Sequence, residues 1–322
     1  MLRSIAILML ASLSICSPLA AQDYPNRPVR LITPYGSGGA TDILARTLAH
    51  KLGEGWGQSV VVENRPGASG TMGSEFVARS APDGYTLQLG TVTTHVLNQI
   101  LRPTRYDGLK DFVPLATLAS SPFLLAVHPS LKVGSVSDLI AYAKANPGKL
   151  SFSSSGVGTS NHLAGELFKA MAGIDIVHVP YKGGTESVLA LIRNDVQMLF
   201  DPLPSTIIAQ AAEGRVIALA TTGMKRSAAV PELPTVAEAG LPGYDVTAWF
   251  GIFAPAHTPA SVVNKIADAI VKASAAPDVL GRLKELGTEP LAIKTTEFQR
   301  MMQRDHERWS NLIRERNITS GN

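Results

Sequence analysis

Four glycine-rich segments, each following an apolar run, are the parts of this chain best suited to bind a ligand. Their glycines are Gly36, Gly38 and Gly39; Gly67, Gly70 and Gly73; Gly156 and Gly158; and Gly183 and Gly184. Glycine lets the backbone turn sharply and approach a ligand closely. Where a helix follows, its first N–H groups are free and its dipole favours an anion. Because neutral donors can surround an ionised carboxylate, the segments predict a site for a small carboxylate anion.

Side chains in and beside these segments supply the other polar groups of the predicted site. The hydroxyls expected to line it belong to Thr41, Ser69, Ser155, Thr159 and Ser160, and Thr91 ends another predicted strand. Asp42 is predicted to lie in the first turn of a helix and to fix the turn before it. Asp201 ends a strand on the crevice side and is the better candidate to face the ligand. An aspartate there repels an anion unless the ligand also carries an amine or hydroxyl donor.

Motifs of other ligand classes are missing from the sequence. The first glycine segment lacks the lysine of a P-loop and the third glycine of a dinucleotide fingerprint, which argues against a nucleotide. No G-x-S-x-G motif occurs, so the sequence does not predict a hydrolase nucleophile. No H-E-x-x-H motif occurs either, so it does not predict a metal site. No cofactor is expected. His162 either contacts the ligand or satisfies local backbone. The enzyme alternative would use Ser155, His162 and Asp201 on a carboxylated substrate.

Predicted strands precede all four segments. They are Val29–Ile32, Ser59–Glu63, Leu150–Ser154 and Ile176–Pro180. Thr41 or Asp42 is expected to cap the first following helix, and Thr159 or Ser160 the third. Further strands are expected at Tyr85–Gly90, Phe112–Leu118, Phe123–Val127, Val196–Phe200, Val216–Thr221, Val246–Ala254 and Glu289–Ile293, and helices at Thr71–Ser80, Val136–Ala145, Thr185–Arg193, Ser205–Glu213, Ser261–Ala273 and Glu297–Arg316. Pro231–Pro242 is expected to be a loop with a short helix.

The alternation of strands and helices predicts an α/β protein, in which ligands bind outside the carboxyl ends of the strands. About 300 mature residues suggest two domains or one large domain. The pattern favours a chain that visits a second domain and returns. We expect the first domain to comprise residues 22–123 and 247–322, and the second residues 124–246.

Residues 1–21 are expected to be a secretory signal peptide, because a short basic start is followed by an apolar stretch and small residues. The mature chain would begin near Gln22 and would hold no cysteine, since Cys16 lies in this leader. Removing Arg3 lowers the basic residues from 29 to 28, against 26 acidic residues. This small net charge, without a basic run, argues against nucleic acid. The periplasm is the expected location.

Several motifs in one order resemble the solute-binding proteins of tripartite tricarboxylate transporters, the Bug family. The likeness runs from Tyr24 to about Arg316. Its motifs are YPNRPVRLITPYGSGGATD, VVENRPGASGTMG, APDGYTL, SSSGVGTSNHLAGELF, VPYKGG and LPTVAEAG. One departure is Tyr35-Gly36-Ser37, where family members often have an apolar aromatic and a proline before the glycine pair.

The resemblance implies a periplasmic-binding-protein-like fold of type II, with two domains, mixed sheets and a ligand buried in the cleft between them. It implies a non-enzymatic protein, expected as a monomer, that delivers a carboxylate to a permease of one large and one small subunit. Backbone amides, hydroxyls and ordered waters of two loops would hold the carboxylate. The residues expected at the ligand are Tyr35, Gly38, Gly39, Thr41, Asp42, Ala68, Ser69, Gly70, Thr91, Ser154, Ser155, Gly158, Thr159, Ser160, His162, Tyr181 and Asp201. A sensor subunit that presents ligand to a membrane kinase would use the same clamp.

Overall fold

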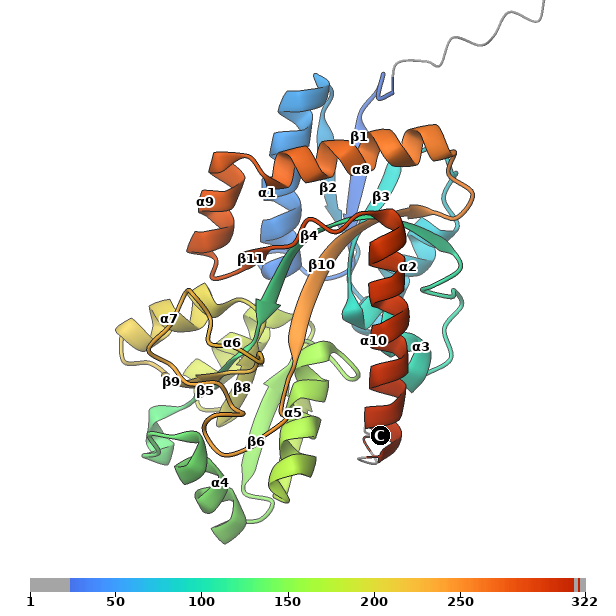
Figure 1. Cartoon of the computed structure of the whole chain (residues 1–322). Coiled ribbons are helices and arrows are strands. Elements are labelled where there is room, and N and C mark those ends of the chain that lie inside the picture. The colour runs from blue at the N-terminus through green and yellow to red at the C-terminus, as the bar shows by residue number, and fades with distance from the viewer. Residues whose placement is uncertain (1–23, 316–317, 319–322) are drawn as a thin grey trace, which may run out of the picture.

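The computed structural model describes residues 24–315 and residue 318, arranged around two β-sheets (Figure 1). The first sheet has six strands in the order β11-β4-β10-β3-β1-β2, and the second has five in the order β7-β6-β8-β5-β9. The predicted signal peptide, residues 1–21, lies outside the described residues. Across the described part of the chain, no helix combines the length and the apolar character needed to cross a membrane.

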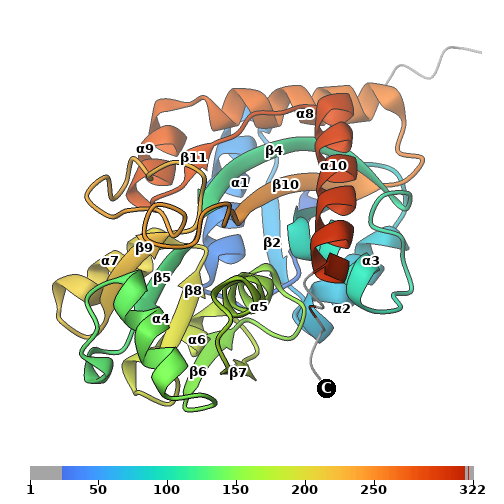
Figure 2. The same ribbon diagram turned by 60° about the horizontal axis from the view of Figure 1, so that its bottom comes forward.

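The first sheet and its helices come from both ends of the described chain. Its strands are β1 (Val29–Thr33), β2 (Val60–Asn64), β3 (Thr86–Thr91), β4 (Phe112–Pro122), β10 (Thr247–Pro255) and β11 (Glu289–Pro290). Its helices are α1 (Ala40–Trp56), α2 (Thr71–Ala78), α3 (Asn98–Leu101), α8 (Ala260–Ser274), α9 (Pro277–Glu285) and α10 (Thr295–Glu315), with a 3₁₀ turn at Ala68–Gly70 and a π-helical turn at Thr93–Leu97. In Figure 2, α8 and α10 lie over this sheet, and both pack against β4.

The second sheet is built from the middle of the chain. Its strands are β5 (Leu124–Val127), β6 (Leu150–Ser154), β7 (Ile176–Pro180), β8 (Met198–Asp201) and β9 (Ile217–Thr221). The helices of this region are α4 (Val136–Ala145), α5 (Ser160–Ala172), α6 (Gly184–Ile192) and α7 (Pro204–Ala212), with a 3₁₀ turn at Pro129–Leu131. Below, the two sheets with their helices are called the first and second lobes. The domain limits at residues 123 and 246 stay a prediction.

Both sheets are mixed, as the family resemblance implies. β1 pairs in parallel with β2 and β3, whereas β10 is antiparallel to β3 and β4. In the second sheet β6 is parallel to β7 and β8, and β5 is antiparallel to β8 and β9. Figure 1 shows β4 and β10 running side by side from the first lobe towards the second. The parallel strands end at the edge of each sheet that faces the other lobe, which is where the glycine-rich turns lie.

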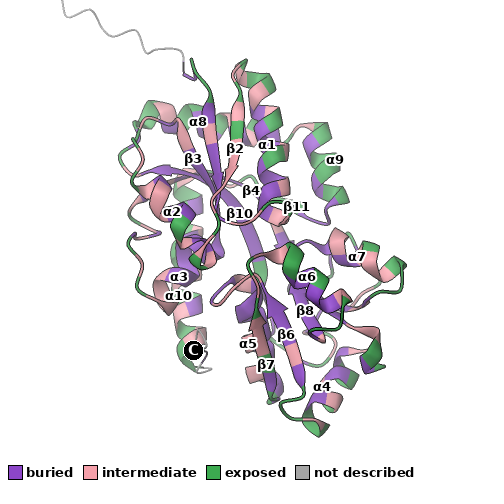
Figure 3. Cartoon of the chain, turned by 180° about the vertical axis from the view of Figure 1, so that it is seen from behind, coloured by how far each residue is buried: buried purple, intermediate pink, exposed green. Residues whose placement is uncertain are grey.

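Apolar side chains at strand and helix spacing hold the first glycine turn between buried elements. Leu31 and Ile32 of β1 are buried, and so are Leu44 and Leu48 of α1. Burying such side chains stabilises each by about 1.5–3 kcal/mol relative to exposure. Figure 3 shows that the central strands are largely buried, whereas helices such as α9 turn an exposed face outwards. The turn after β1 is therefore fixed at both of its ends.

Three local predictions are wrong. The cap of α1 is Gly39, without a side-chain hydrogen bond, so Thr41 and Asp42 lie in the first turn instead. The stretch 231–242 forms turns and one bridge to Thr221 rather than a short helix, because its three prolines lack the N–H that helical bonds require. β11 has two residues rather than five, and beyond it the contact with β4 continues through the hydrogen bond from Leu291 N–H to Leu118 O and a bridge from Lys294 to Ala116.

Besides the two 3₁₀ turns, three helical segments were not predicted. α9 follows α8 after a break at Ala275–Ala276, and Pro277 stands in its first turn. The π turn at Thr93–Leu97 and the short helix α3 follow β3 directly. His95 of the π turn is fully buried and stacks on Phe253 at 3.6 Å between ring centroids. A contact between residues so distant in the chain has no local signal.

Candidate functional site

A cavity of about 220 Å³ lies between the two lobes and is lined by residues of both. Nine of the residues expected at the ligand line it: Tyr35, Gly38, Gly39, Thr41, Thr91, Ser155, Thr159, Ser160 and Asp201. Eight expected residues lie outside its lining: Asp42, Ala68, Ser69, Gly70, Ser154, Gly158, His162 and Tyr181. Of the second group, Asp42 and His162 accept hydrogen bonds from glycine turns, and Ser69 contacts the other lobe.

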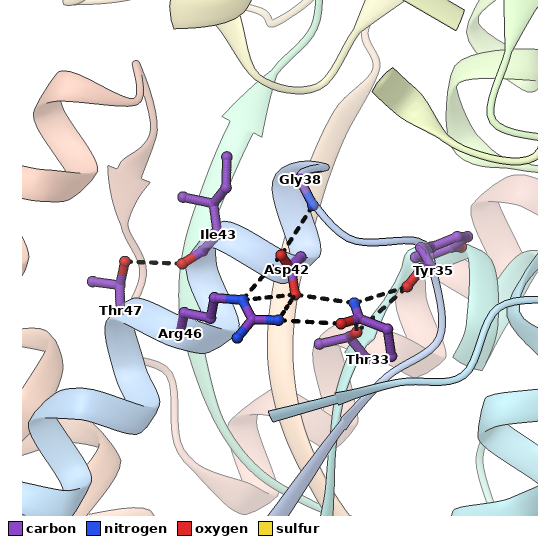
Figure 4. A network of polar contacts seen from close by, with 8 residues as sticks. Thr33, Tyr35, Gly38, Asp42, Ile43, Arg46 and Thr47 are labelled. Atoms are coloured by element: carbon purple, nitrogen blue, oxygen red, sulfur yellow. Dashed lines mark hydrogen bonds and ion pairs between the residues drawn. The ribbon is translucent and has the colours of Figure 1, made fainter. Parts of the chain in front are cut away.

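The first glycine turn is held in place by the carboxylate of Asp42 (Figure 4). Gly38 has φ of +80° and donates its N–H to Asp42 Oδ2 at 3.0 Å. Arg46 Nε donates to the same carboxylate at 3.1 Å, and Asn64 Nδ2 donates to Oδ1 at 3.0 Å. Burial opposes ionisation of Asp42, but the hydrogen bonds from Arg46, Gly38 and Asn64 outweigh it and lower its pKa. The charge of Asp42 is therefore neutralised within the turn, which is the role that the sequence favours for this residue.

The third glycine turn leads from β6 into α5. Thr159 occupies the N-cap position of α5, and its Oγ1 lies 2.6 Å from both Gly156 O and Asn161 Oδ1. Ser155 Oγ accepts from Asn161 Nδ2 at 3.2 Å. The first N–H groups of a helix have no partner within the helix. The backbone N–H groups of Ser155 and Thr159 already bond within the turn, so these two residues bring ordered hydroxyl groups to the cavity wall.

His162 supports this turn from behind. Its Nδ1 accepts a hydrogen bond from Gly158 N–H at 3.0 Å, and its ring lies 3.9 Å from the ring of His178. Burial lowers the pKa of His162 to about 3, so the ring is neutral and can accept this bond. Of the two roles that the sequence leaves open, the structure shows the contact with local backbone.

The fourth glycine turn reaches the cavity, whereas the second does not. Gly184 and Thr185, at the start of α6, line the cavity. At the second turn, Ser69 Oγ donates to Val157 O of the other lobe at 2.5 Å. Arg102 donates to the same carbonyl oxygen. The second turn therefore contacts the third turn instead of lining the cavity.

Most of the cavity wall that was not predicted is apolar. It comprises Ala40 of α1, Val188, Leu189 and Ile192 of α6, Pro202 and Leu203 beside α7, and Ala248 and Phe250 of β10. Thr93, Asn161, Thr206 and Gln210 add neutral polar groups. Val188 and Ile192 are one helical turn apart, so they share a face of α6. This spacing marks an apolar face, but the sequence does not say whether that face covers core or cavity.

Among the described residues that line the cavity, Asp201 is the only aspartate, and no glutamate lines it. No lysine, arginine or histidine belongs to this lining. Burial raises the pKa of Asp201 to about 7 and the pKa of Tyr35 to about 12. Within the described chain, no group of three or more histidine, cysteine, aspartate or glutamate residues could hold a metal ion. An anion in this cavity would be held by neutral donors.

Comparisons with known proteins agree on one family. A model of the family described as "Tripartite tricarboxylate transporter family receptor" matches residues 44–318. The protein BugT of Bordetella pertussis is 33% identical over 319 residues, which cover 98% of each chain. This alignment takes in both lobes and the cavity between them.

Two solved structures are similar over nearly the whole chain. A structure titled "R. palustris Rpa4515 with adipate" is 37% identical, covers 92% of this chain and 99% of that one, and has a TM-score of 0.89. The protein MatC from Rhodopseudomonas palustris with bound malate is 31% identical, covers 90% of this chain and 100% of that one, and has a TM-score of 0.84. Both titles name a dicarboxylate as the bound molecule.

Proposed function

Because this chain belongs to the receptor family of tripartite tricarboxylate transporters, which includes the Bug proteins, we propose that it captures a small carboxylate and delivers it to a membrane transporter of that type. The observation that carries the proposal is a cavity lined by helix-starting glycine turns of both lobes, with no cationic side chain in its described lining. Free N–H groups and hydroxyls suit an ionised carboxylate. The family consists of receptors, so it supports binding and not the secreted-enzyme alternative.

The proposed binding mode uses one turn from each lobe. Gly39 and Thr41 at the start of α1 face the cavity from the first lobe, and Thr159 and Ser160 at the start of α5 face it from the second. Two helix dipoles then act on one anion, and each favours negative charge at its N-terminus by about 0.3–1 kcal/mol. Adipate and malate in the related structures support a carboxylate as the ligand class.

The proposed cellular role follows from the family. Residues 1–21 would direct the chain to the periplasm, and the mature protein would act there as a monomer. Two domains, residues 22–123 with 247–322 and residues 124–246, would close on the ligand. A ligand that binds the closed form better than the open form shifts the population towards the closed form. A permease of one large and one small subunit would recognise that closed form.

A thermal-shift screen of organic acids tests this proposal. The mature chain from Gln22 would be heated with mono-, di- and tricarboxylates, and hits would be confirmed by calorimetry. A ligand at about 100 times its dissociation constant adds ~2.7 kcal/mol of stability. We expect at least one acid to raise the melting temperature by several degrees. If no carboxylate does so, the carboxylate proposal fails; turnover of a bound acid would instead favour the enzyme alternative.

A further inference from the structure

The carboxyl group of Asp201 is the one feature of the cavity that a simple carboxylate does not explain. Asp201 ends β8, is 5% exposed and lines the cavity. Its Oδ1 accepts the N–H of Leu203 at 2.7 Å. Its Oδ2 accepts no hydrogen bond from any residue that the structure describes. Because Oδ2 keeps some accessible surface in the cavity, a ligand group that supplies a donor can bond to it.

The walls near Asp201 determine what the rest of the ligand can be. Leu203 lies two residues after it, and Val188, Ile192 and Phe250 add apolar surface to the same cavity. Such a wall suits a hydrocarbon chain or ring. The neutral donors Thr206 and Gln210 of α7 also line the cavity. They offer the competing possibility, which is that this end holds a second carboxylate while Asp201 is protonated.

Charge separates these two possibilities. An ionised Asp201 repels a second carboxylate, and no lysine, arginine or histidine in the described lining offsets that repulsion. A hydroxyl or ammonium group instead donates to Oδ2, and a hydrogen bond to a charged acceptor is stronger than one between neutral groups. Because burial raises the pKa of Asp201 only to about 7, the carboxylate form dominates at pH 8.

We propose that Asp201 is a specificity-determining residue, which selects a carboxylate whose apolar body carries a hydroxyl or amino donor at its far end. A dicarboxylate of the same length would bind more weakly at pH 8. This inference rests on the proposed function, because it assumes that the glycine turns hold the first carboxylate. It narrows the ligand from carboxylates in general to ω-hydroxy and ω-amino acids with an apolar body.

Matched acids test the inference by calorimetry at pH 8. One series is hexanoate, 6-hydroxyhexanoate, 6-aminohexanoate and adipate; the other is benzoate, 4-hydroxybenzoate, 4-(aminomethyl)benzoate and terephthalate. Within a series only the far end changes. We expect a donor-bearing member to bind at least about tenfold more tightly than the unsubstituted acid and the diacid. The Asp201→Asn variant should reduce that preference to about twofold and improve binding of the diacid, because the amide is neutral.

Two controls make the outcomes distinct. Asn at position 201 keeps an oxygen for Leu203 N–H, and a melting curve verifies that the variant folds. Asp175→Asn removes an exposed carboxylate from the same lobe and should leave every affinity unchanged. Equal or tighter binding of the diacids, or a donor preference that survives in Asp201→Asn, overturns this inference but leaves the proposed function standing. If no acid of these series or of the wider screen binds, the proposed function itself fails.

Discussion

At the scale of single residues, Asp42 and Asp201 show how partners decide what a carboxyl group does. Asp42 accepts bonds from Arg46, Asn64 and Gly38 N–H, and its pKa is lowered. Among the residues that the structure describes, Asp201 accepts only from Leu203 N–H, and burial raises its pKa to about 7. The first is therefore a permanent anion that fixes a turn. The second can change its charge near neutral pH.

This difference predicts how the ligand-free protein's stability depends on pH. The pKa of Asp201 is raised from 3.8 to about 7 on folding, so the folded state binds the proton more tightly. The contribution of protonated Asp201 to the free energy of unfolding is fully present below pH 3.8, and it is lost as the pH rises through about 7. Asp201→Asn removes this loss. The unfolding free energies of both proteins would be measured in urea at pH 5 and pH 8. From pH 5 to pH 8, the value for the variant should rise by roughly 2 kcal/mol relative to that of wild type.

The matched control for this pH effect is Asp175→Asn, whose side chain is exposed. Its unfolding free energy should follow that of wild type at both pH values. Parallel pH profiles for wild type and Asp201→Asn would mean that Asp201 has an ordinary pKa in the folded protein.

Thr159 allows a second prediction at this scale. Its hydroxyl lies at the α5 N-cap and lines the cavity, within 2.6 Å of Asn161 Oδ1. Thr159→Val keeps the shape and removes the hydroxyl, so we expect carboxylate affinity to fall about tenfold, the equivalent of about one hydrogen bond. Calorimetry with the best acid of the screen measures it. Thr47→Val, in α1 and outside the cavity lining, is the control. Unchanged affinity in Thr159→Val would remove this hydroxyl from the site.

The sequence predicts residues of this site where local chemistry identifies them, and misses the others. Gly39, Thr41 and Thr159 lie at the starts of helices that follow strands after a short glycine turn, so their position near a strand end can be predicted. Val188 and Phe250 are ordinary helix and strand residues. That they face a cavity depends on how the lobes pack, and no local pattern encodes this.

At the scale of elements, clear ends make boundaries predictable. The predicted bounds of α4 and β6 agree with the structure, because Ser135 caps α4 through Asp138 N–H at 3.0 Å and Pro147-Gly148 follows it. The π turn after β3 has no such signal. Its place depends on Gly90, where a Cβ atom would lie 2.3 Å from the His95 ring. Contacts of this kind exist only in the folded chain.

Gly165 of α5 gives the prediction for this scale. A Cβ atom there would lie 2.1 Å from the Phe152 ring of β6, closer than side chains can pack. Gly165→Ala should therefore lower the unfolding free energy by about 1–3 kcal/mol, as overpacking does, and disturb the third glycine turn. Gly281→Ala is the matched control, since that helical glycine has open space around it and should gain up to about 1 kcal/mol. Urea unfolding of wild type and both variants measures these free energies. If Gly165→Ala were as stable as wild type, α5 would be able to shift away from β6.

At the scale of the whole molecule, polar contacts join the two lobes beside the cavity. Ser69 Oγ and Arg102 both donate to Val157 O, and Ser160 N–H donates to Thr93 Oγ1 at 2.9 Å. These bonds connect the second turn and the π segment of the first lobe with the third turn of the second. The sequence predicts the second turn as a ligand contact because it has the same glycine pattern as the others. Only the arrangement of the lobes shows it contacting Val157.

These contacts predict that Arg102 affects affinity without lining the cavity. A bond made only when the lobes meet stabilises the closed form, and the apparent dissociation constant rises as the closed fraction falls. Arg102→Ala should therefore weaken carboxylate binding by about tenfold and raise the radius of gyration of the ligand-saturated protein in X-ray scattering. Arg105→Ala removes an exposed arginine that lies 3.9 Å from Glu75 in the same lobe, and it should change neither quantity. If Arg102→Ala binds as wild type does and scatters alike, the bond to Val157 forms in both open and closed arrangements and closure depends on the ligand alone.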